Sequence, residues 1–224
     1  MTYRIYSEIC GPWENFSHII EDVATKKVMI IDPAWQPELI LERISKLNLI
    51  PSVIFLTHAH HDHVNGIAGI LEQVNIPVHL SDIEINLLKK HPETQPFGAI
   101  TAQTLSLYDN DIYMLGATKI KVIHTPGHSC GSSCFLLEND MITGDTLFID
   151  GVGRTDFADS STDALFESLQ KIVSSVPHHV NLHTGHAYGS SATATLASQL
   201  ITNPYLQRIN QNKRADFADY RSSH

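Results

Sequence analysis

The spacing of apolar positions changes along the chain, and it predicts the order of strands and helices. YRIYSEI, NFSHIIED and KKVMIID are short and rich in strand-forming residues, which predicts three strands, with a turn at residues 23–27 between the last two. PELILERISKLNL predicts a helix that starts at Pro37, with apolar residues at helical spacing at Leu39, Ile40, Ile44 and Leu47. The continuously apolar SVIFLT that follows is typical of a buried strand.

The alternation continues through the rest of the chain. We expect a helix over VNGIAGILEQV, a strand over IPVHLS, a helix over DIEINLLKK and an irregular surface segment over residues 91–111. DIYMLG with ATKIKVIHT, and SCFLLE with MITGD, predict two hairpins. Ser160 and Asp163 form a capping-box pattern before a helix with an apolar face of Leu165, Leu169, Ile172, Val173 and Val176. HVNLHTG predicts a last strand and SATATLASQLI a last helix.

Hairpins mixed with strand–helix units predict an α/β (α+β) fold, with mixed sheets covered by helices in one domain over residues 1–224. The composition, 42% hydrophobic and 17% charged residues, is that of a globular protein. A net charge of −9 argues against a nucleic-acid partner, because phosphate binding needs a basic face. Because the chain shows neither a secretory signal pattern nor an apolar run of about 20 residues, we expect a cytoplasmic protein without a membrane segment. The three cysteines are too few for a disulfide framework.

The stretch LTHAHHDHVNG concentrates potential metal ligands directly after the predicted strand SVIFLT. The chain has 14 histidines, and neutral imidazole is the commonest metal ligand. His58 and His60 are two residues apart, so in an extended segment they point to the same side. Asp62 and His63 fall in the first turn of the next helix. Four ligands from one short loop are enough to seed two adjacent metal ions.

Three further candidates lie directly after predicted strands, namely His128 in HTPGHSCG, Asp145 in MITGDTLF and His186 in NLHTGHAYG. Each one follows a glycine that allows the backbone to bend sharply into a crowded site, at Gly127, Gly144 and Gly185. Taken alone, each candidate would more often be a turn residue or a cap. Seven ligand-type residues at the ends of four strands make coincidence a poor explanation.

Such a set of residues predicts metal-assisted hydrolysis. Two divalent ions can share a hydroxide, because metal binding lowers the pKa of water to about 7, and this hydroxide attacks an ester, thioester or amide. Asp62 is placed to accept the remaining proton. A structural metal-binding protein is the non-enzyme alternative, but structural zinc sites are closed and usually rich in Cys, whereas this set consists of His and Asp. Cys130, two residues after His128, is more often a packed or outer group than a ligand.

Four motifs together, THAHHDH, TPGHSCGS, TGDTLF and TGHAYG, resemble those of the metallo-β-lactamase superfamily over most of the chain. The resemblance implies an αββα sandwich of two mixed β-sheets flanked by helices, with the site at one edge. Asp145 resembles the carboxylate that bridges two metal ions, and His61 stands at the variable position of the first motif, where we expect it to lie outside the ligand set. The implied ligands are, for the first ion, His58, His60 and His128, and for the second ion, Asp62, His63 and His186.

Within this superfamily the chain most resembles glyoxalase II, through TGDTLF, GVGRTDF, GHAYG and TNPYL. The resemblance implies a dinuclear zinc enzyme that cleaves a small-molecule thioester, such as an acyl-glutathione or an acyl-CoA. Glyoxalase II carries a glutathione-binding helical domain where only a short stretch follows His186, and it usually has Lys in place of Arg154. We expect Arg154 to bind an anionic part of the substrate, or else to pair with Asp156. Tyr188 is expected to contact substrate, or else to pack on the last helix.

Two other relatives of the same fold remain open. GRTDF resembles the persulfide dioxygenases, in which a single iron ion would be held by a facial triad of His58, His128 and Asp145. ICGPWENF, IDPAW and THAHHDHVN resemble small zinc hydrolases encoded with bacterial polyketide synthases, which implies an acyl thioester on a carrier protein or coenzyme A. The same ligands serve either reaction, so motifs alone do not decide between two zinc ions and one iron ion.

Overall fold

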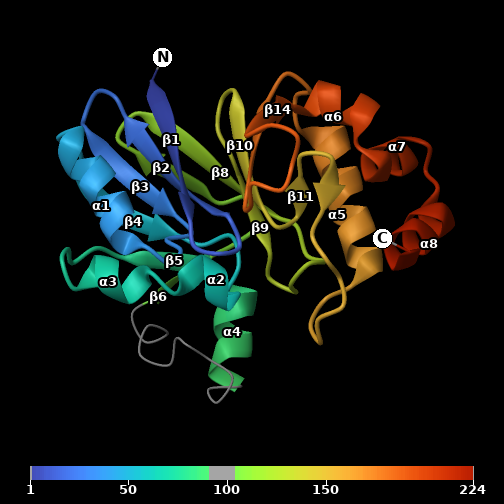
Figure 1. Cartoon of the computed structure of the whole chain (residues 1–224), viewed down its shortest axis with the longest axis horizontal. Coiled ribbons are helices and arrows are strands. Elements are labelled where there is room, and N and C mark those ends of the chain that lie inside the picture. Colours follow the sequence, from blue (N-terminus) through green and yellow to red (C-terminus); the bar gives the residue numbers. More distant parts are fainter. Residues whose placement is uncertain (1, 91–103, 224) are drawn as a thin grey trace.

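The computed structural model describes residues 2–90 and 104–223, which form two six-stranded sheets packed face to face (Figure 1). Both sheets are mixed, and helices cover their outer faces, so the predicted sandwich is confirmed. The first sheet has the order β1-β2-β3-β4-β5-β6, antiparallel as far as β3 and parallel from β3 onward. Its strands are β1 (Tyr3–Cys10), β2 (Asn15–Asp22), β3 (Lys27–Ile31), β4 (Ile50–Phe55), β5 (Val78–Ser81) and β6 (Thr104–Leu107).

The second sheet has the order β14-β13-β10-β9-β8-β7 and is antiparallel except for the parallel pair β10 and β13. A short hairpin of β11 and β12 lies beside it. The strands are β7 (Ile112–Leu115), β8 (Thr118–His124), β9 (Ser133–Leu136), β10 (Asp140–Gly144), β11 (Leu147–Phe148), β12 (Gly151–Val152), β13 (Asn181–Thr184) and β14 (Thr193–Thr195).

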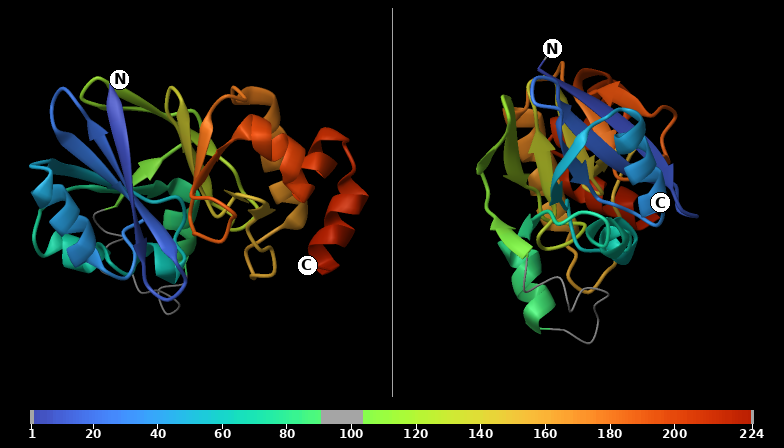
Figure 2. Two further views of the ribbon diagram at one scale, coloured as in Figure 1. Left: turned by 45° about the horizontal axis from the view of Figure 1, so that its top comes forward. Right: turned by 90° about the vertical axis from the view of Figure 1, so that its left-hand side faces the viewer.

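Helices divide between the two outer faces according to their place in the sequence (Figures 1 and 2). Those on the first sheet are α1 (Pro37–Lys46), α2 (His61–Val64), α3 (Ile67–Leu71) and α4 (Asp82–Lys90). Those on the second sheet are α5 (Thr162–Ser175), α6 (Leu196–Thr202), α7 (Pro204–Asn210) and α8 (Arg214–Ser223). None of the described helices is long and apolar enough to cross a membrane.

Strand β4 shows how the apolar pattern builds the layers. Val53 and Phe55 point into the cluster between the two sheets, whereas Ile54 and Leu56 point into the cluster under the helices of the first sheet. Because side chains alternate along a strand, a strand with both faces covered must be apolar at every position. The continuous apolar run SVIFLT therefore becomes a central strand, and its end carries the histidine cluster into the structure.

The helix predicted after residue 160 is α5, but its cap differs from the prediction. The Ser161 hydroxyl accepts the Ala164 N–H at 3.2 Å, while the Ser160 hydroxyl donates to the Phe157 carbonyl. The capping box of Ser160 and Asp163 is therefore wrong by one residue. Two adjacent serines offer the same capping oxygen, and the turn that Ser160 makes with Phe157 leaves the cap to Ser161.

Two other predicted helices are interrupted. The helix over VNGIAGILEQV is replaced by α2 and α3, which break at Gly66, where the backbone N–H donates to the Pro33 carbonyl and an added Cβ would lie 2.7 Å from that oxygen. The stretch SATATLASQLI begins as β14, and α6 starts at Leu196 with the Thr195 hydroxyl as its cap. At Gly66 a contact with a distant part of the chain overrides the local helical pattern, and at β14 the pairing with β13 does so.

The prediction of an irregular segment over residues 91–111 can be compared with the structure only from residue 104 onward, because positions 91–103 lie outside the described residues. Thr104–Leu107 form β6, so the prediction of an irregular segment is wrong there. Helices α7 and α8 were not predicted from the sequence. Helix α8 is mostly polar and docks through the buried Phe217, whose ring lies 5.3 Å from that of Phe166.

Candidate metal centre

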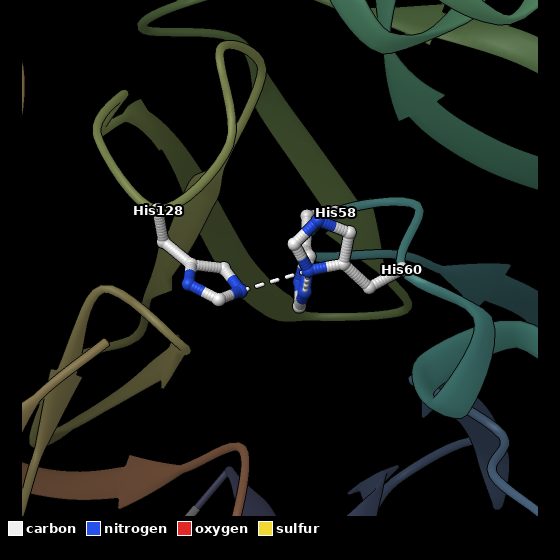
Figure 3. Close-up of side chains that lie close together, drawn as sticks. All are labelled: His58, His60 and His128. Atoms are coloured by element: carbon white, nitrogen blue, oxygen red, sulfur yellow. Dashed lines mark hydrogen bonds between the residues drawn. The ribbon is translucent and has the colours of Figure 1, made fainter. Parts of the chain in front are cut away.

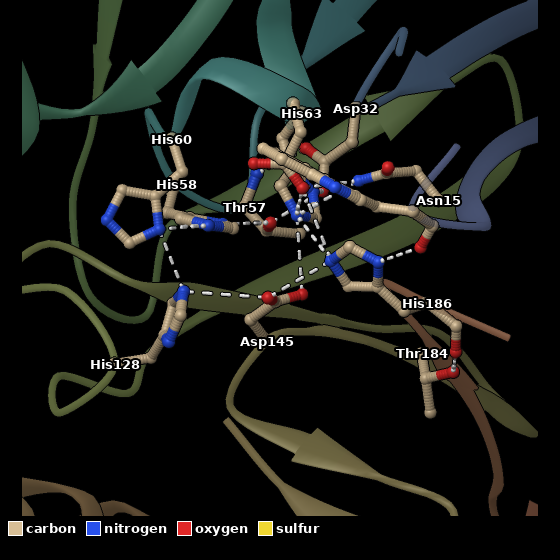
Figure 4. A network of polar contacts seen from close by, with 12 residues as sticks. Asn15, Asp32, Thr57, His58, His60, His63, His128, Asp145, Thr184 and His186 are labelled. Carbon is tan, nitrogen blue, oxygen red and sulfur yellow. Dashed lines mark hydrogen bonds and ion pairs between the residues drawn. The ribbon is translucent and has the colours of Figure 1, made fainter. Parts of the chain in front are cut away.

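The predicted ligands lie on four loops, each of which begins where a strand ends at the same edge of the sandwich (Figure 4). The loop after β4 carries residues 58–63, and the loops after β8, β10 and β13 carry His128, Asp145 and His186. Strand β4 belongs to the first sheet and the other three strands to the second, so the site lies between the ends of the two sheets. All seven predicted ligands are brought together, and all of them are buried except His60, which is partly buried.

His58, His60 and His128 form a first group of converging ligand atoms (Figure 3). The Nδ1 of His60 lies 3.1 Å from the Nε2 of His58 and 2.9 Å from the Nε2 of His128. Burial lowers the pKa of His58 well below its ordinary value and the pKa of His60 to about 4, so these rings are neutral. Neutral imidazole is the form that binds a metal ion.

Asp62, His63 and His186 form a second group. The Oδ2 of Asp62 lies 3.4 Å from the Nε2 of each histidine, and the two Nε2 atoms are 3.3 Å apart. Burial lowers the pKa of His186, but hydrogen bonds to Asp145 and Asp62 outweigh this effect and raise the pKa to about 9. A bound cation would replace the proton that these carboxylates now attract to the ring.

Asp145 lies between the two groups. Its Oδ1 is 3.4 Å from the Nε2 of His63, and its Oδ2 is 3.3 Å from that of His186 and 3.5 Å from that of His128. The carboxylate therefore faces ligands of both groups, as expected of a bridging residue. Within the described part of the chain its buried Oδ1 accepts no hydrogen bond. Since a buried carboxylate oxygen is costly without a partner, this atom fits a metal ligand.

The distances within both groups also fit metal binding. Two ligand atoms bound at ~2.0–2.1 Å to one tetrahedral zinc ion lie about 3.3 Å apart. The separations of adjacent ligand atoms within the groups range from 2.9 to 3.4 Å. A donor set of imidazole and carboxylate also suits iron and manganese, so the ligands define a metal centre without choosing the metal.

Two histidines are oriented by backbone carbonyl groups. The Nδ1–H of His128 donates to the Arg154 carbonyl at 2.8 Å, and the Nδ1–H of His186 donates to the Trp13 carbonyl at 2.7 Å. A carbonyl can only accept, so each ring holds a proton on Nδ1 and turns its Nε2 toward the site. Backbone partners of this kind leave no side-chain pattern in the sequence, so they were not predicted.

His63 and His58 are oriented by a shared pair of side chains, Asp32 and Thr57. The Nδ1–H of His63 donates to Asp32 at 3.0 Å, and the Thr57 hydroxyl donates to the same carboxylate at 2.6 Å. The Thr57 oxygen then accepts from the Nδ1 of His58 at 3.0 Å. Asp32 was not among the predicted site residues, although it directly follows β3 as Asp145 follows β10.

The metal-binding groups open into a pocket of about 710 Å³. Its walls include the apolar side chains of Trp13, Phe148, Phe157 and Val152. The Tyr188 ring also lines it and stacks on His186, with ring centroids 4.6 Å apart and planes at 12°, rather than packing on the last helix. A concave, largely apolar pocket with a few polar groups at its base is typical of a substrate site.

Arg154 and His61 both border this pocket. The Arg154 guanidinium forms a bidentate ion pair with Asp156, with both N···O distances at 2.6 Å, and lies 4.7 Å from the centroid of the Phe157 ring. Its side chain thus makes the ion pair that was one of the two expectations, while it stays on the pocket wall. His61 is exposed, lies outside the two ligand groups and contacts Trp35 edge-on.

Glu84 on α4 supports the loop that carries His128. Its carboxylate accepts a hydrogen bond from the Ser129 hydroxyl, and the side chains of Cys130 and Asp159 lie nearby. Burial raises the pKa of Glu84 to about 7, although the hydrogen bond from Ser129 acts in the opposite direction. Burial also raises the pKa of the Cys130 thiol to about 12, in keeping with a packed group rather than a thiolate ligand.

We expect the substitution Glu84→Gln to change how stability depends on pH. The folded carboxyl keeps its proton up to about pH 7, whereas its ordinary pKa is 4.5, so folding loses stability as the pH rises from 4.5 to 7. The variant lacks this loss, so between pH 5 and pH 8 its free energy of unfolding should rise by up to about 3 kcal/mol relative to that of the natural chain. Urea unfolding of both proteins at pH 5 and pH 8 measures the difference. If the free energy of unfolding changes equally with pH in the two proteins, Glu84 is ionised in the folded protein.

The fold and the site together define a metal-binding centre of His and Asp residues at one edge of a two-sheet sandwich. A family model described as the metallo-β-lactamase superfamily matches residues 10–180, and the chain belongs to this superfamily. The predicted resemblance is therefore confirmed.

A curated relative and two solved structures are similar over nearly the whole chain. The probable polyketide biosynthesis zinc-dependent hydrolase BaeB of Bacillus velezensis is 32% identical over 94% of this chain and 88% of its own length. The crystal structure of ETHE1 from Myxococcus xanthus has a TM-score of 0.82, with 25% identity over 99% of this chain and 90% of that one. TTHA1623 in a di-iron-bound form has a TM-score of 0.76, with 29% identity over 90% of this chain and 100% of that one.

Proposed function

We propose that the protein is a hydrolase of acyl thioesters that works with two zinc ions. The observation that carries this proposal is the position of Asp145, whose two oxygens face ligands of both groups. An enzyme with one ion needs only one group together with Asp145. The second group nevertheless has a complete set of three converging ligands, two of them histidines held by hydrogen bonds to Asp32 and Trp13.

The pocket supports an acyl substrate. Its apolar walls suit an acyl chain, and the proposed metal ions lie at its base, where a carbonyl group would meet them. The relative BaeB is named a probable polyketide biosynthesis zinc-dependent hydrolase, which supports a thioester held on a carrier protein as one substrate of this chain. Acyl-glutathione and acyl-CoA are the small-molecule thioesters of the same chemical class.

Hydrolysis adds water across the thioester: a C–O bond forms, the C–S bond breaks, and a proton passes to the departing thiolate. Bound metal ions supply a water molecule of lowered pKa and polarise the carbonyl oxygen. Burial raises the pKa of Asp62, but hydrogen bonds from His186 and Asn15 and the charge of His63 bring it below its ordinary range. Asp62 is therefore ionised and placed to accept a proton from water. Asp145 holds the two ligand groups together.

The structural likeness to ETHE1 supports an alternative with one iron ion, held by His58, His128 and Asp145. The same three residues are present in either case, and the difference lies in whether the second group binds an ion. A purely structural metal site is a third alternative. Structural sites are closed by four ligands, whereas both groups here border a pocket of about 710 Å³.

Metal content tests the proposal directly. We expect about two zinc ions per chain by mass spectrometry, on protein purified without a metal-scavenging tag, and release of free thiol from a panel of glutathione, CoA and carrier-bound acyl thioesters. About one iron ion, with oxygen uptake in the presence of glutathione persulfide, would establish the dioxygenase instead. Equal turnover of carrier-bound and free small thioesters would count against a carrier protein as partner. A metal that never exchanges, with no thioester turnover, would indicate a structural site.

Arg154 is the proposed contact for an anionic part of the substrate. We expect Arg154→Ala to raise KM for a glutathione thioester about tenfold, since a hydrogen bond to a charged group contributes roughly 1.5–3 kcal/mol. KM for an uncharged N-acetylcysteamine thioester should not change, which makes that substrate the matched control. The exposed pair with Asp156 contributes at most about 1 kcal/mol to folding. Lower stability with unchanged KM would assign Arg154 to the ion pair alone.

A further inference from the structure

The turn between β1 and β2, residues 11–14, lies against the second ligand group together with the first residue of β2, Asn15. Its Trp13 carbonyl accepts the Nδ1–H of His186 at 2.7 Å. The Nδ2 of Asn15 donates to the Oδ2 of Asp62 at 2.7 Å and lies 3.5 Å from the Nε2 of His63. All three ligands of the second group are therefore touched from this one segment.

The first group takes its support from other parts of the chain. His58 is bonded to Thr57 and His128 to the Arg154 carbonyl, neither of which belongs to the β1–β2 turn. A change in the turn therefore acts directly on the second group, which is linked to the first group through Asp32 and Thr57. These different supports make it possible to alter the second group while the first group keeps its own hydrogen bonds.

The amide of Asn15 can adopt only one orientation. Its Oδ1 accepts from the indole Nε1–H of Trp35 at 2.9 Å, and an indole N–H can only donate. With Oδ1 turned to the indole, Nδ2 faces the Oδ2 of Asp62 and donates to it at 2.7 Å. The Asn15 side chain is completely buried, which prevents water from taking over either hydrogen bond. Trp35, Asn15 and Asp62 thus form a directional chain of hydrogen bonds.

The backbone around Asn15 is also held in place. The N–H of Phe16 donates to the Gly185 carbonyl at 2.8 Å, and the N–H of Ala187 donates to the Glu14 carbonyl at 2.9 Å. These bonds tie the turn to the loop that carries His186. The distance between Asn15 and the second group is therefore set by the backbone rather than by a flexible side chain.

We propose that Asn15 is a positioning residue that sets the affinity of the second ligand group for its metal ion, and that it does so without affecting the first group. The Oδ2 of Asp62 is the oxygen that faces His63 and His186, and the Asn15 amide occupies one of its acceptor sites. The remaining lone pair is then directed at the point where the three ligand atoms converge. The inference rests on the proposed two-ion site.

The test is the number and affinity of bound zinc ions in Asn15→Ala, measured by mass spectrometry and by titration against a chromophoric chelator. We expect two ions in the natural chain, and in the variant one tightly bound ion with a second bound about 10- to 100-fold more weakly, the usual effect of losing an outer hydrogen bond. Trp35→Phe keeps the amide but removes the indole donor that orients it. Trp35→Phe should also lower the affinity for the second ion, by a smaller factor than Asn15→Ala. It provides the test if Asn15→Ala does not fold.

Asn203→Ala is the matched control. Asn203 is also a completely buried asparagine with a fully bonded amide, but it donates to the Phe148 and Gly151 carbonyls instead of a ligand. It should lose stability as Asn15→Ala does, with both ions retained. Equal loss of the second ion in Asn15→Ala and Asn203→Ala, or its full retention in Asn15→Ala, overturns the inference. A natural chain that binds a single ion, held equally by Asn15→Ala, contradicts the two-ion proposal itself.

Discussion

Asp145→Ala is expected to reduce thioester hydrolysis to background and to lower the affinity for metal by more than about 100-fold. Removal of a residue that only hydrogen-bonds to a metal ligand lowers this affinity by up to about 100-fold, and removal of a ligand should lower it further. The physical reason is that the Asp145 carboxylate faces His63 and His186 of the second group and His128 of the first. Its removal also leaves these positively polarised rings without the charge that they face. Zinc content and equilibrium dialysis measure the loss of metal affinity, and a thiol-release assay measures the loss of hydrolysis.

His61→Ala provides the control for this experiment. His61 lines the same pocket and belongs to the same loop as the ligands, but it is exposed and outside both groups. Zinc content should stay at the natural value. A large loss of zinc in His61→Ala, or normal zinc in Asp145→Ala, would show that the ligands are assigned incorrectly.

Gly185→Ala is expected to lower kcat/KM by about 100-fold although it removes no ligand, because a displacement of about 1 Å in a catalytic group can have an effect of this size. A Cβ at position 185 would lie 2.2 Å from the Oδ1 of Asp145 and 3.0 Å from the Cε1 of His63. The carboxylate must move to make room, and it would leave the position between the two groups. A thiol-release assay and a zinc titration measure the result.

Gly151→Ala is the matched control for Gly185→Ala. The added Cβ at position 151 would meet only the Cβ of Phe148, at 3.8 Å, which is an ordinary contact. We expect its activity and zinc content to match those of the natural chain. If Gly185→Ala retains full activity, the carboxylate of Asp145 is not required at the position where the structure places it.

From the sequence, the glycines before His128, Asp145 and His186 were explained in one way, by the sharp backbone bend that glycine allows. In the structure these glycines are required for two different reasons. Gly127 has a φ of +148° and Gly144 a φ of +48°, so both adopt backbone conformations that other residues rarely take. Gly185 has no positive φ and is required for space, because the Asp145 carboxylate lies against it. A local sequence pattern marks all three positions alike, and only the packed site shows why each is glycine.

Predictions succeeded where the signal is local. Strand β4 follows from its continuous apolar run, and the helices α1 and α5 follow from apolar residues at helical spacing. Predictions failed where a distant contact decides the outcome. The break between α2 and α3 depends on the Pro33 carbonyl, and α8 depends on the packing of Phe217.

By itself the sequence determined which residue types gather at the ends of strands, because alternation along a strand and adjacency to its end are local properties. It thereby indicated all seven candidate ligands, from His58 to His186. The family resemblance implied their division into two groups, and the tertiary structure places the ligand atoms of each group close together with Asp145 between them. The tertiary structure alone brought Asn15 to Asp62 and the Trp13 carbonyl to His186, across 47 and 173 positions of the sequence. The first contact depends on the arrangement of strands within the first sheet and the second on the packing of the two sheets against each other, and no short-range pattern encodes either.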